Sequence, residues 1–278
     1  VAVLASGVRA AAPDPCAPLD VPALAARVVP AIESWTLANG LRVHVVPRPS
    51  DATVAVRVAY DVGARDEAPG RSGTAHLFEH LMFKGSQRLA DGAHFRIVRD
   101  AGGRTNAATD WDTTQYWSTV PPAALERVLF AEADRMRALR ITDASLANQR
   151  AAIDEERGQL YGIPYAEAAE AFGLELWEGT PYGHSVIGTR EELATMDAAE
   201  AARFHRRFYA PANAVLVLVG RVDPARARDA IDATFGDVVR DDARPARAPT
   251  ELAPRPIRRV VADPLAPFPV YADAPDRP

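Results

Sequence analysis

The sequence predicts a domain of the α+β class, in which strands and helices form packed layers. Two observations support this prediction. Short segments of alternating apolar and polar residues follow one another through hairpin-like connections, which is typical of antiparallel strands. Longer segments with apolar residues three and four positions apart are mixed with them, and this period is typical of amphipathic helices.

Six segments are predicted to be strands. Asn39-Gly40 separates the first two, and this dipeptide favours a tight hairpin turn. The last segment, Val215 to Val219, is apolar throughout and is therefore expected to be buried. The predicted strands cover residues 33–37, 41–46, 53–60, 105–108, 114–120 and 215–219.

Seven segments are predicted to be helices. The first is expected to begin at Ser72 or Thr74, either of which could cap it, and to end at Gly85. A long helix is expected to start at Pro121-Pro122, with an apolar face that continues to Leu139. The other predicted helices cover residues 91–101, 143–161, 166–178, 197–208 and 224–235.

The first of these helices carries three polar residues that could form a metal site. They are His76, Glu79 and His80, in the order His-x-x-Glu-His. Residues three and four apart lie on one side of an α-helix, so the two imidazoles can bind one divalent cation and the carboxylate can reach a water on it. Because the surrounding residues are nearly all apolar, the helix should be buried, which is costly for unpartnered polar groups. The alternative is that core hydrogen bonds satisfy the histidines and an arginine pairs with Glu79.

The helix over 143–161 offers a third ligand, which a catalytic zinc usually requires. Its core-facing stripe contains two polar residues, Gln149 and Glu156. Glu156 is the candidate ligand, and Gln149 is expected one or two turns away as a supporting group. Alternatively, Glu156 pairs with Arg150 or Arg157 at the helix edge, because most acidic residues lie at the surface. The stripe consists of Leu146, Gln149, Ile153, Glu156 and Leu160.

The chain resembles the pitrilysin/insulysin/mitochondrial processing peptidase family of zinc peptidases. The resemblance extends over about residues 33 to 240, in the family's order. In that family the third ligand is a glutamate about 76 residues after the motif, which corresponds to Glu156. Many members carry a glutamate seven residues before it, where this chain has Gln149, so a charge near the metal is missing but no ligand is. Besides the motif, the similar segments are 102–116, 148–157, 181–188 and 208–220.

This resemblance implies a mainly antiparallel sheet backed by helices, as one full copy of a metallopeptidase domain of the LuxS/mitochondrial-processing-peptidase type. It also implies one Zn²⁺ per chain, held by His76, His80 and Glu156. Glu79 is then expected to act as the catalytic base.

The family places its peptide substrate on an edge strand. The resemblance puts Asn106, Ala107 and Thr109 on that strand as substrate-binding residues. An edge strand can accept an extended peptide through its unpaired amides and carbonyls. The alternative for Asn106 is simple turn chemistry near the glycines that precede it.

Three parts of the chain are expected to differ in organisation. Residues 1–32, rich in Ala, Val and Pro, form a leader that fits either the remnant of a signal peptide or a plain extension; the former favours a periplasmic or secreted protein. Residues 33–240 form the peptidase domain. Residues 241–278 begin as a Pro- and Arg-rich linker and continue into the start of a second homologous domain that is absent. A homologous domain or subunit is therefore the expected partner that closes the site.

Composition narrows the remaining possibilities. A net charge of −5 without a basic block argues against nucleic acid as a partner. No apolar run approaches the roughly 18 residues that a membrane span needs. Cys16 is the single cysteine, which excludes an internal disulfide and a cysteine zinc site.

Together these features predict a zinc-dependent metalloendopeptidase that cleaves peptides or unfolded segments with a metal-activated water. The alternative is a non-catalytic peptide-binding or scaffolding subunit of a hetero-oligomeric peptidase. The intact motif favours the enzyme, whereas the missing second domain favours the alternative. A zinc hydrolase of non-peptide substrates would use the same ligands.

Overall fold

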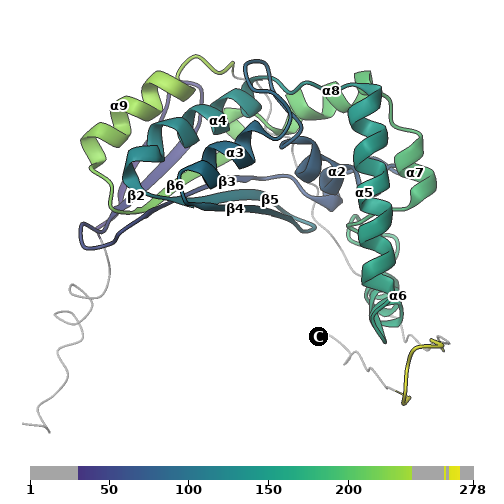
Figure 1. Cartoon of the computed structure of the whole chain (residues 1–278). Coiled ribbons are helices and arrows are strands. Elements are labelled where there is room, and N and C mark those ends of the chain that lie inside the picture. Colours follow the sequence, from purple (N-terminus) through teal and green to yellow (C-terminus); the bar gives the residue numbers. More distant parts are fainter. Residues whose placement is uncertain (1–30, 240–259, 261–262, 270–278) are drawn as a thin grey trace, which may run out of the picture. The chain divides into compact units, whose positions relative to one another are not determined.

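A computed structural model describes residues 31–239, 260 and 263–269. Residues 1–30 of the predicted leader and most of the predicted segment 241–278 lie outside these residues. Six strands form one sheet in the order β1-β2-β6-β3-β5-β4 (Figure 1). They are β1 (Glu33–Thr36), β2 (Arg42–Pro47), β3 (Val54–Tyr60), β4 (Arg104–Thr109), β5 (Thr114–Val120) and β6 (Ala214–Gly220).

The sheet is mainly antiparallel, which confirms the predicted fold class. Every neighbouring pair is antiparallel except β2 with β6. Strand β6, from the end of the domain, lies between β2 and β3. Strand β4 is last in the order, so one of its edges has no partner strand among the described residues.

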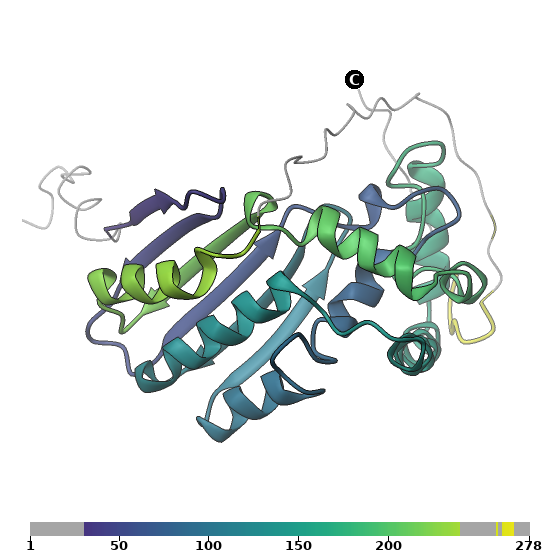
Figure 2. The ribbon, with the colours of Figure 1, turned by 90° about the horizontal axis from the view of Figure 1, so that it is seen from above.

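Helices cover one face of this sheet and gather at one end of it. Helices α3 (Ala93–Asp100), α4 (Leu125–Arg137) and α9 (Pro224–Phe235) lie over the covered face (Figures 1 and 2). Of the helices described, none combines the length and the apolar character needed to cross a bilayer. At or beyond one end of the strands lie α2 (Thr74–Leu81), α5 (Asp143–Tyr161), α6 (Ala166–Leu176), α7 (Arg190–Ala194) and α8 (Ala198–Phe208).

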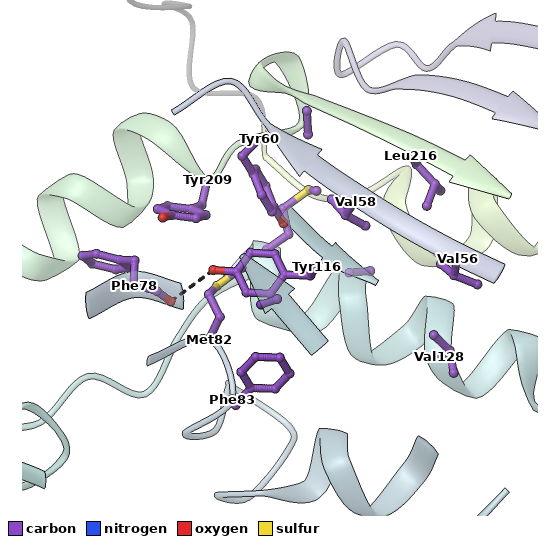
Figure 3. Packing of buried hydrophobic residues seen from close by; sticks show 14 of the residues in the cluster. Val56, Val58, Tyr60, Phe78, Met82, Phe83, Tyr116, Val128, Tyr209 and Leu216 are labelled. Carbon is purple, nitrogen blue, oxygen red and sulfur yellow. Dashed lines mark hydrogen bonds between the residues drawn. The ribbon is translucent and has the colours of Figure 1, made fainter. Parts of the chain in front are cut away.

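The core lies between the covered face and the helices above it. Alternate residues of β3, such as Val56 and Val58, are buried because successive side chains point to opposite faces. Towards α2 the core becomes aromatic (Figure 3). The Tyr116 hydroxyl on β5 donates to the Phe78 carbonyl of α2 at 3.1 Å, and the Phe78 ring stacks on Tyr209 at 5.2 Å. These contacts fix α2 against the sheet.

A buried ion pair supports the same region from behind. Glu132 and Arg135 of α4 are 1% and 2% exposed and are joined by hydrogen bonds of 2.6 to 2.9 Å. The guanidinium also lies 4.2 Å from the centre of the Tyr116 ring and 5.1 Å from that of Phe83. Burial raises the pKa of Glu132, and the charge of Arg135 opposes that shift. The pair thus holds two charges in the core beside the residue that anchors α2.

Helix α2 does not begin as the sequence predicts. Its N-cap is Gly73, at φ +84°, and neither Ser72 nor Thr74 caps it. A Cβ at Gly73 would lie 2.8 Å from the carbonyl oxygen of Ile187, so the close approach of that loop requires glycine. The cap comes from Glu67, whose carboxylate accepts hydrogen bonds from the amides of Gly73 at 3.0 Å and Ala75 at 2.7 Å. A buried carboxylate at a helix N-terminus accepts hydrogen bonds from the free amides there, and its negative charge interacts favourably with the helix dipole.

A loop histidine completes this cap. His184 Nε2 lies 3.0 Å from the Glu67 carboxylate, whose side chain is fully buried. Burial raises the pKa of Glu67 to about 7, and its hydrogen bond with His184 partly opposes the shift. The same bond raises the pKa of His184. The Glu67 carboxylate that caps α2 is therefore held by a loop more than a hundred positions further along the chain.

Other predicted boundaries move for identifiable reasons. Helix α2 ends at Leu81, and residues 82–84 turn before Gly85 at φ +106°. Leu139 lies beyond α4, which ends at Arg137. The predicted core-facing stripe of α5 is buried only as far as Ile153. The Glu156 side chain is 49% exposed and Leu160 is 39% exposed, because α5 continues past the sheet, where little can cover it (Figure 1). The five-residue α7 is too short to show a helical period and was not predicted.

Replacing Glu132 by glutamine should destabilise the fold strongly. Arg135 would keep its charge in the core without a counter-charge, which typically costs about 3–5 kcal/mol. Thermal unfolding of the variant should therefore occur at a clearly lower temperature. Glu126→Gln on the exposed side of α4 is the matched control and should change stability little. Equal unfolding temperatures for the two variants would contradict the structural role of the pair.

The Glu67–His184 pair should make stability depend on pH. Both pKa values are raised by folding, so the folded chain binds more protons than the unfolded chain, and this contribution is lost as pH rises through about 7. Glu67→Gln cannot titrate there. The unfolding temperature of the wild type minus that of this variant should therefore be more positive near about pH 6 than near about pH 8.5. Measurements in the presence of a chelator exclude metal effects, and a pH-independent difference would contradict the linkage.

Candidate metal centre

Two helices bring three potential ligands to one point. Helix α2 presents His76 and His80 one turn apart, and α5 crosses it to present Glu156. Glu156 Oε2 lies 3.6 Å from His76 Nε2 and 3.4 Å from His80 Nε2. One ligand atom from each residue lies within 4.8 Å of the other two.

The spacing of these atoms fits a tetrahedral cation. Two donor atoms about 2.1 Å from such an ion are separated by about 3.4 Å, whereas a direct hydrogen bond would be about 2.7–3.2 Å long. The separations of 3.4 and 3.6 Å match the former. Two imidazole nitrogens and a carboxylate oxygen are also a donor set that zinc accepts. The residues present therefore fit a zinc ion.

Burial keeps both imidazoles in the form that binds metals. Burial, together with the neighbouring His80 and Arg157, lowers the pKa of His76 to about 4. Burial also lowers the pKa of His80, although the charge of Glu156 opposes this. At neutral pH the two rings are therefore neutral, and their contacts with Glu156 are not ion pairs. A neutral imidazole has a free lone pair for a cation.

Among the residues that it describes, the structure does not show the alternative partners that the sequence allows for the histidines and for Glu156, which are core hydrogen bonds and a neighbouring arginine. His76 Nδ1 is buried without a hydrogen-bond partner in the described part of the chain, so core hydrogen bonds do not satisfy this ring. Arg157 bonds to Asp154 and to backbone carbonyls, and Arg150 bonds to a backbone carbonyl. Neither arginine forms an ion pair with Glu156 within residues 31–239.

Glu79 lies beside this cluster with an unexpected partner. Its Oε2 accepts a hydrogen bond of 2.7 Å from the Thr109 hydroxyl at the end of β4. The pKa of Glu79 is raised, mainly by burial; the Thr109 bond opposes the shift and the charge of Glu156 adds to it. Thr109, which the sequence suggested as a substrate contact, thus contacts the predicted base. Sequence spacing gives no signal for this bond, because it joins residues 30 positions apart.

The other predicted site residues lie at different depths. Gln149 is 4% exposed, and its side-chain amide donates a hydrogen bond to Asn148. It also opposes the fall in the pKa of His80, which places it close to that candidate ligand. Asn106 is exposed on the edge strand β4. Ala107 is buried, so a substrate could meet its backbone but not its side chain.

Two family profiles match the chain. The profile described as Insulinase (Peptidase family M16) matches residues 42–190, which are 149 of the 278 residues. The profile described as Peptidase M16 inactive domain matches residues 195–270. The second region includes β6, which lies between β2 and β3, so both regions contribute strands to one sheet.

Several known proteins resemble the chain over about half of their own length. The zinc protease PqqE of Helicobacter pylori is 33% identical over 197 residues, which are 70% of this chain and 44% of that protein. A probable mitochondrial-processing peptidase subunit beta of Arabidopsis thaliana is 25% identical over 240 residues, 84% of this chain and 45% of that protein. The crystal structure of a protease from Helicobacter pylori has a TM-score of 0.73 at 29% identity, covering 80% of this chain and 54% of that one.

The family assignment follows from the coverage of the first profile, which includes all three potential ligands. The fold agrees, because the structural neighbours are M16 peptidase domains. The chain spans about half the length of the curated relatives it matches. The chain belongs to the insulinase (M16) family of peptidases.

Proposed function

We propose that this chain is a zinc-dependent metalloendopeptidase that hydrolyses peptide bonds in peptides or unfolded segments. The observation that supports it most directly is the convergence of His76, His80 and Glu156, with a separate carboxylate, Glu79, beside them. In this proposal the first three hold one Zn²⁺. When bound, Zn²⁺ supplies Lewis-acid chemistry, which lowers the pKa of water towards about 7 and polarises a carbonyl oxygen.

Glu79 is the proposed general base. It takes a proton from the attacking water and later gives it to the leaving amine. Its raised pKa suits both steps, because a carboxylate that binds a proton more strongly can accept it and hold it until the amine departs. The Thr109 hydroxyl holds one carboxylate oxygen of Glu79 in place and limits the rise in pKa.

The free edge of β4 is the proposed place for the substrate. An extended peptide can add to an edge strand through main-chain hydrogen bonds. Asn106 offers an exposed amide side chain for a further bond to the peptide, and Ala107 offers its backbone. Because Thr109 ends the same strand and touches Glu79, a peptide along β4 passes the proposed base.

One observation supports the alternative of a non-catalytic peptide-binding or scaffolding subunit. The chain spans about half of its relatives, and one of these is a subunit by name. A second homologous domain or subunit is therefore the proposed partner that completes the site. The potential ligands and the base are all present, however, which supports catalysis over scaffolding.

Glu79→Gln tests the base. Glutamine keeps the shape of the side chain but cannot take a proton, so cleavage of a quenched fluorescent peptide should fall by at least about a hundredfold. Zinc content, measured by elemental analysis, should stay near one ion per chain. The assay is run on this chain alone and with a homologous second half supplied separately. Undiminished cleavage by the variant would exclude Glu79 as the base.

Glu156→Ala tests the third ligand. Loss of an oxygen ligand should weaken zinc binding by more than about a hundredfold, since even outer-shell changes cost about 10–100-fold. Competition with a chromogenic chelator measures this affinity directly. Glu155→Ala removes an adjacent exposed carboxylate and is the matched control that should keep its zinc. Unchanged affinity in Glu156→Ala would remove this residue from the site.

A further inference from the structure

The sheet has one face without helices. Helices α3, α4 and α9 lie on the same side of it, and no described helix lies against the other side (Figures 1 and 2). Burial alternates accordingly along β3 and β5, where every second residue is buried and the others are accessible. We call the accessible side the open face.

The pairing register defines which residues form the open face. Paired residues on neighbouring strands point to the same side, so the face consists of three rows that cross the sheet. The row nearest the metal centre contains Arg42, Val215, Ala59, Gln115 and Ala108; the middle row contains Ser34, His44, Val217, Arg57, Trp117 and Asn106; the far row contains Val46, Val219, Ala55, Thr119 and Arg104; Thr36 lies beside Arg42.

The composition of the open face is biased. None of these 17 residues is acidic, and three of them are arginines, in a chain with a net charge of −5. Arg57 bonds to the neutral Gln115 and lies 5.9 Å from the ring centre of Trp117. Within residues 31–239, neither Arg57 nor Arg104 forms an ion pair with a carboxylate. The face therefore offers positive charge and apolar area without internal neutralisation.

This face is continuous with the proposed substrate strand. Asn106 belongs to its middle row, together with Arg57 and Trp117. Thr109, the last residue of β4, donates a hydrogen bond to Glu79 beside the candidate metal centre. Arg104 lies five residues before Thr109, which corresponds to about 17 Å along a strand. A peptide that extends along β4 from the metal centre therefore reaches Arg104 within about five residues.

Charge decides which occupant suits the face. Two copies of this chain would bring arginines opposite arginines, and like charges across an interface cost several kcal/mol. An acidic partner gains from the same arrangement. Each of the three rows contains one arginine and no carboxylate, so the positive charge extends across the face from the row nearest the metal centre to the far row.

From this arrangement we propose that the open face binds acidic side chains of the peptide substrate, about four to six residues from the bond that is cleaved. The inference rests on the proposed function and adds a substrate class to it. Arg104 would contact such a side chain at the edge, and Arg57 would contact one that turns onto the face beside Trp117. Zinc and Glu79 would determine the reaction, and these arginines would determine which peptides enter it.

Two labelled peptides test the proposal. They share a neutral sequence, and one carries three consecutive glutamates near one end where the other carries glutamines. Binding is measured by fluorescence anisotropy to the zinc-loaded Glu79→Gln chain, so that no cleavage occurs. The glutamate peptide should bind at least about fivefold more tightly, and about 0.5 M salt should remove the difference.

Charge reversal assigns the effect to the face. Arg57→Glu with Arg104→Glu should abolish the preference while binding of the glutamine peptide stays unchanged. Arg226→Glu with Arg228→Glu on α9, on the helical side of the sheet, changes the net charge by the same amount and should keep the preference. If the doubly reversed chain fails to fold, the doubly neutral variant with glutamine at positions 57 and 104 gives the same comparison.

Several results would overturn the proposal. They are equal binding of the two peptides, a preference that survives charge reversal, and self-association that depends on Arg57 and Arg104. Preferential binding of a labelled oligonucleotide through these arginines would also overturn it. Failure of the proposed function is distinguishable, because it appears as absent cleavage of the glutamine peptide by the zinc-loaded chain, whereas this inference is read from binding alone.

Discussion

The crossing of α2 and α5 is the contact on which the rest of this site depends. His80 and Glu156 lie 76 positions apart, and their side chains meet only if the two helices are held in register. Helix α5 contributes Leu146 and Ile153 to the core beneath the site, which fixes its depth. Helix α2 is fixed at its middle by the Tyr116 bond and at its start by Glu67. Each restraint comes from a distant part of the chain.

Burial and charge act together at this crossing. The same desolvation lowers the pKa of the histidines and raises that of Glu79, so it favours the neutral form of every group. A divalent cation attracts the anionic carboxylate of Glu156 and is compatible with neutral imidazoles. The arrangement is therefore unfavourable for unpaired charges but suited to a cation held by two neutral ligands and one anionic ligand. The Thr109 hydroxyl limits the rise in the pKa of Glu79 and adds no charge of its own.

The sequence predicts the local features of the fold and site well. The spacing of His76, Glu79 and His80 has one geometric consequence on a helix, and the stripe that contains Gln149 and Glu156 likewise follows from helical period. Features that depend on distant contacts were missed. Ser72 and Thr74 are good cap residues by composition, but the close approach of the 187–188 loop selects Gly73 and an external carboxylate. The sequence also suggests that Leu160 continues the buried stripe. In the structure this part of α5 extends past the sheet, so Leu160 is exposed.

The charge of the open face illustrates the same limit in another way. Arg57 and Arg104 are 47 positions apart and are unremarkable in sequence; they share a face because β5 pairs with both β3 and β4 in defined register. A one-residue shift in either pairing would move one arginine to the helical side, where its charge would be buried. The register that builds the core beneath Tyr116 therefore also sets the charge pattern opposite it. Since β4 belongs both to that pattern and, through Thr109, to the candidate metal centre, the proposed substrate selection and the proposed catalysis would both depend on one short strand.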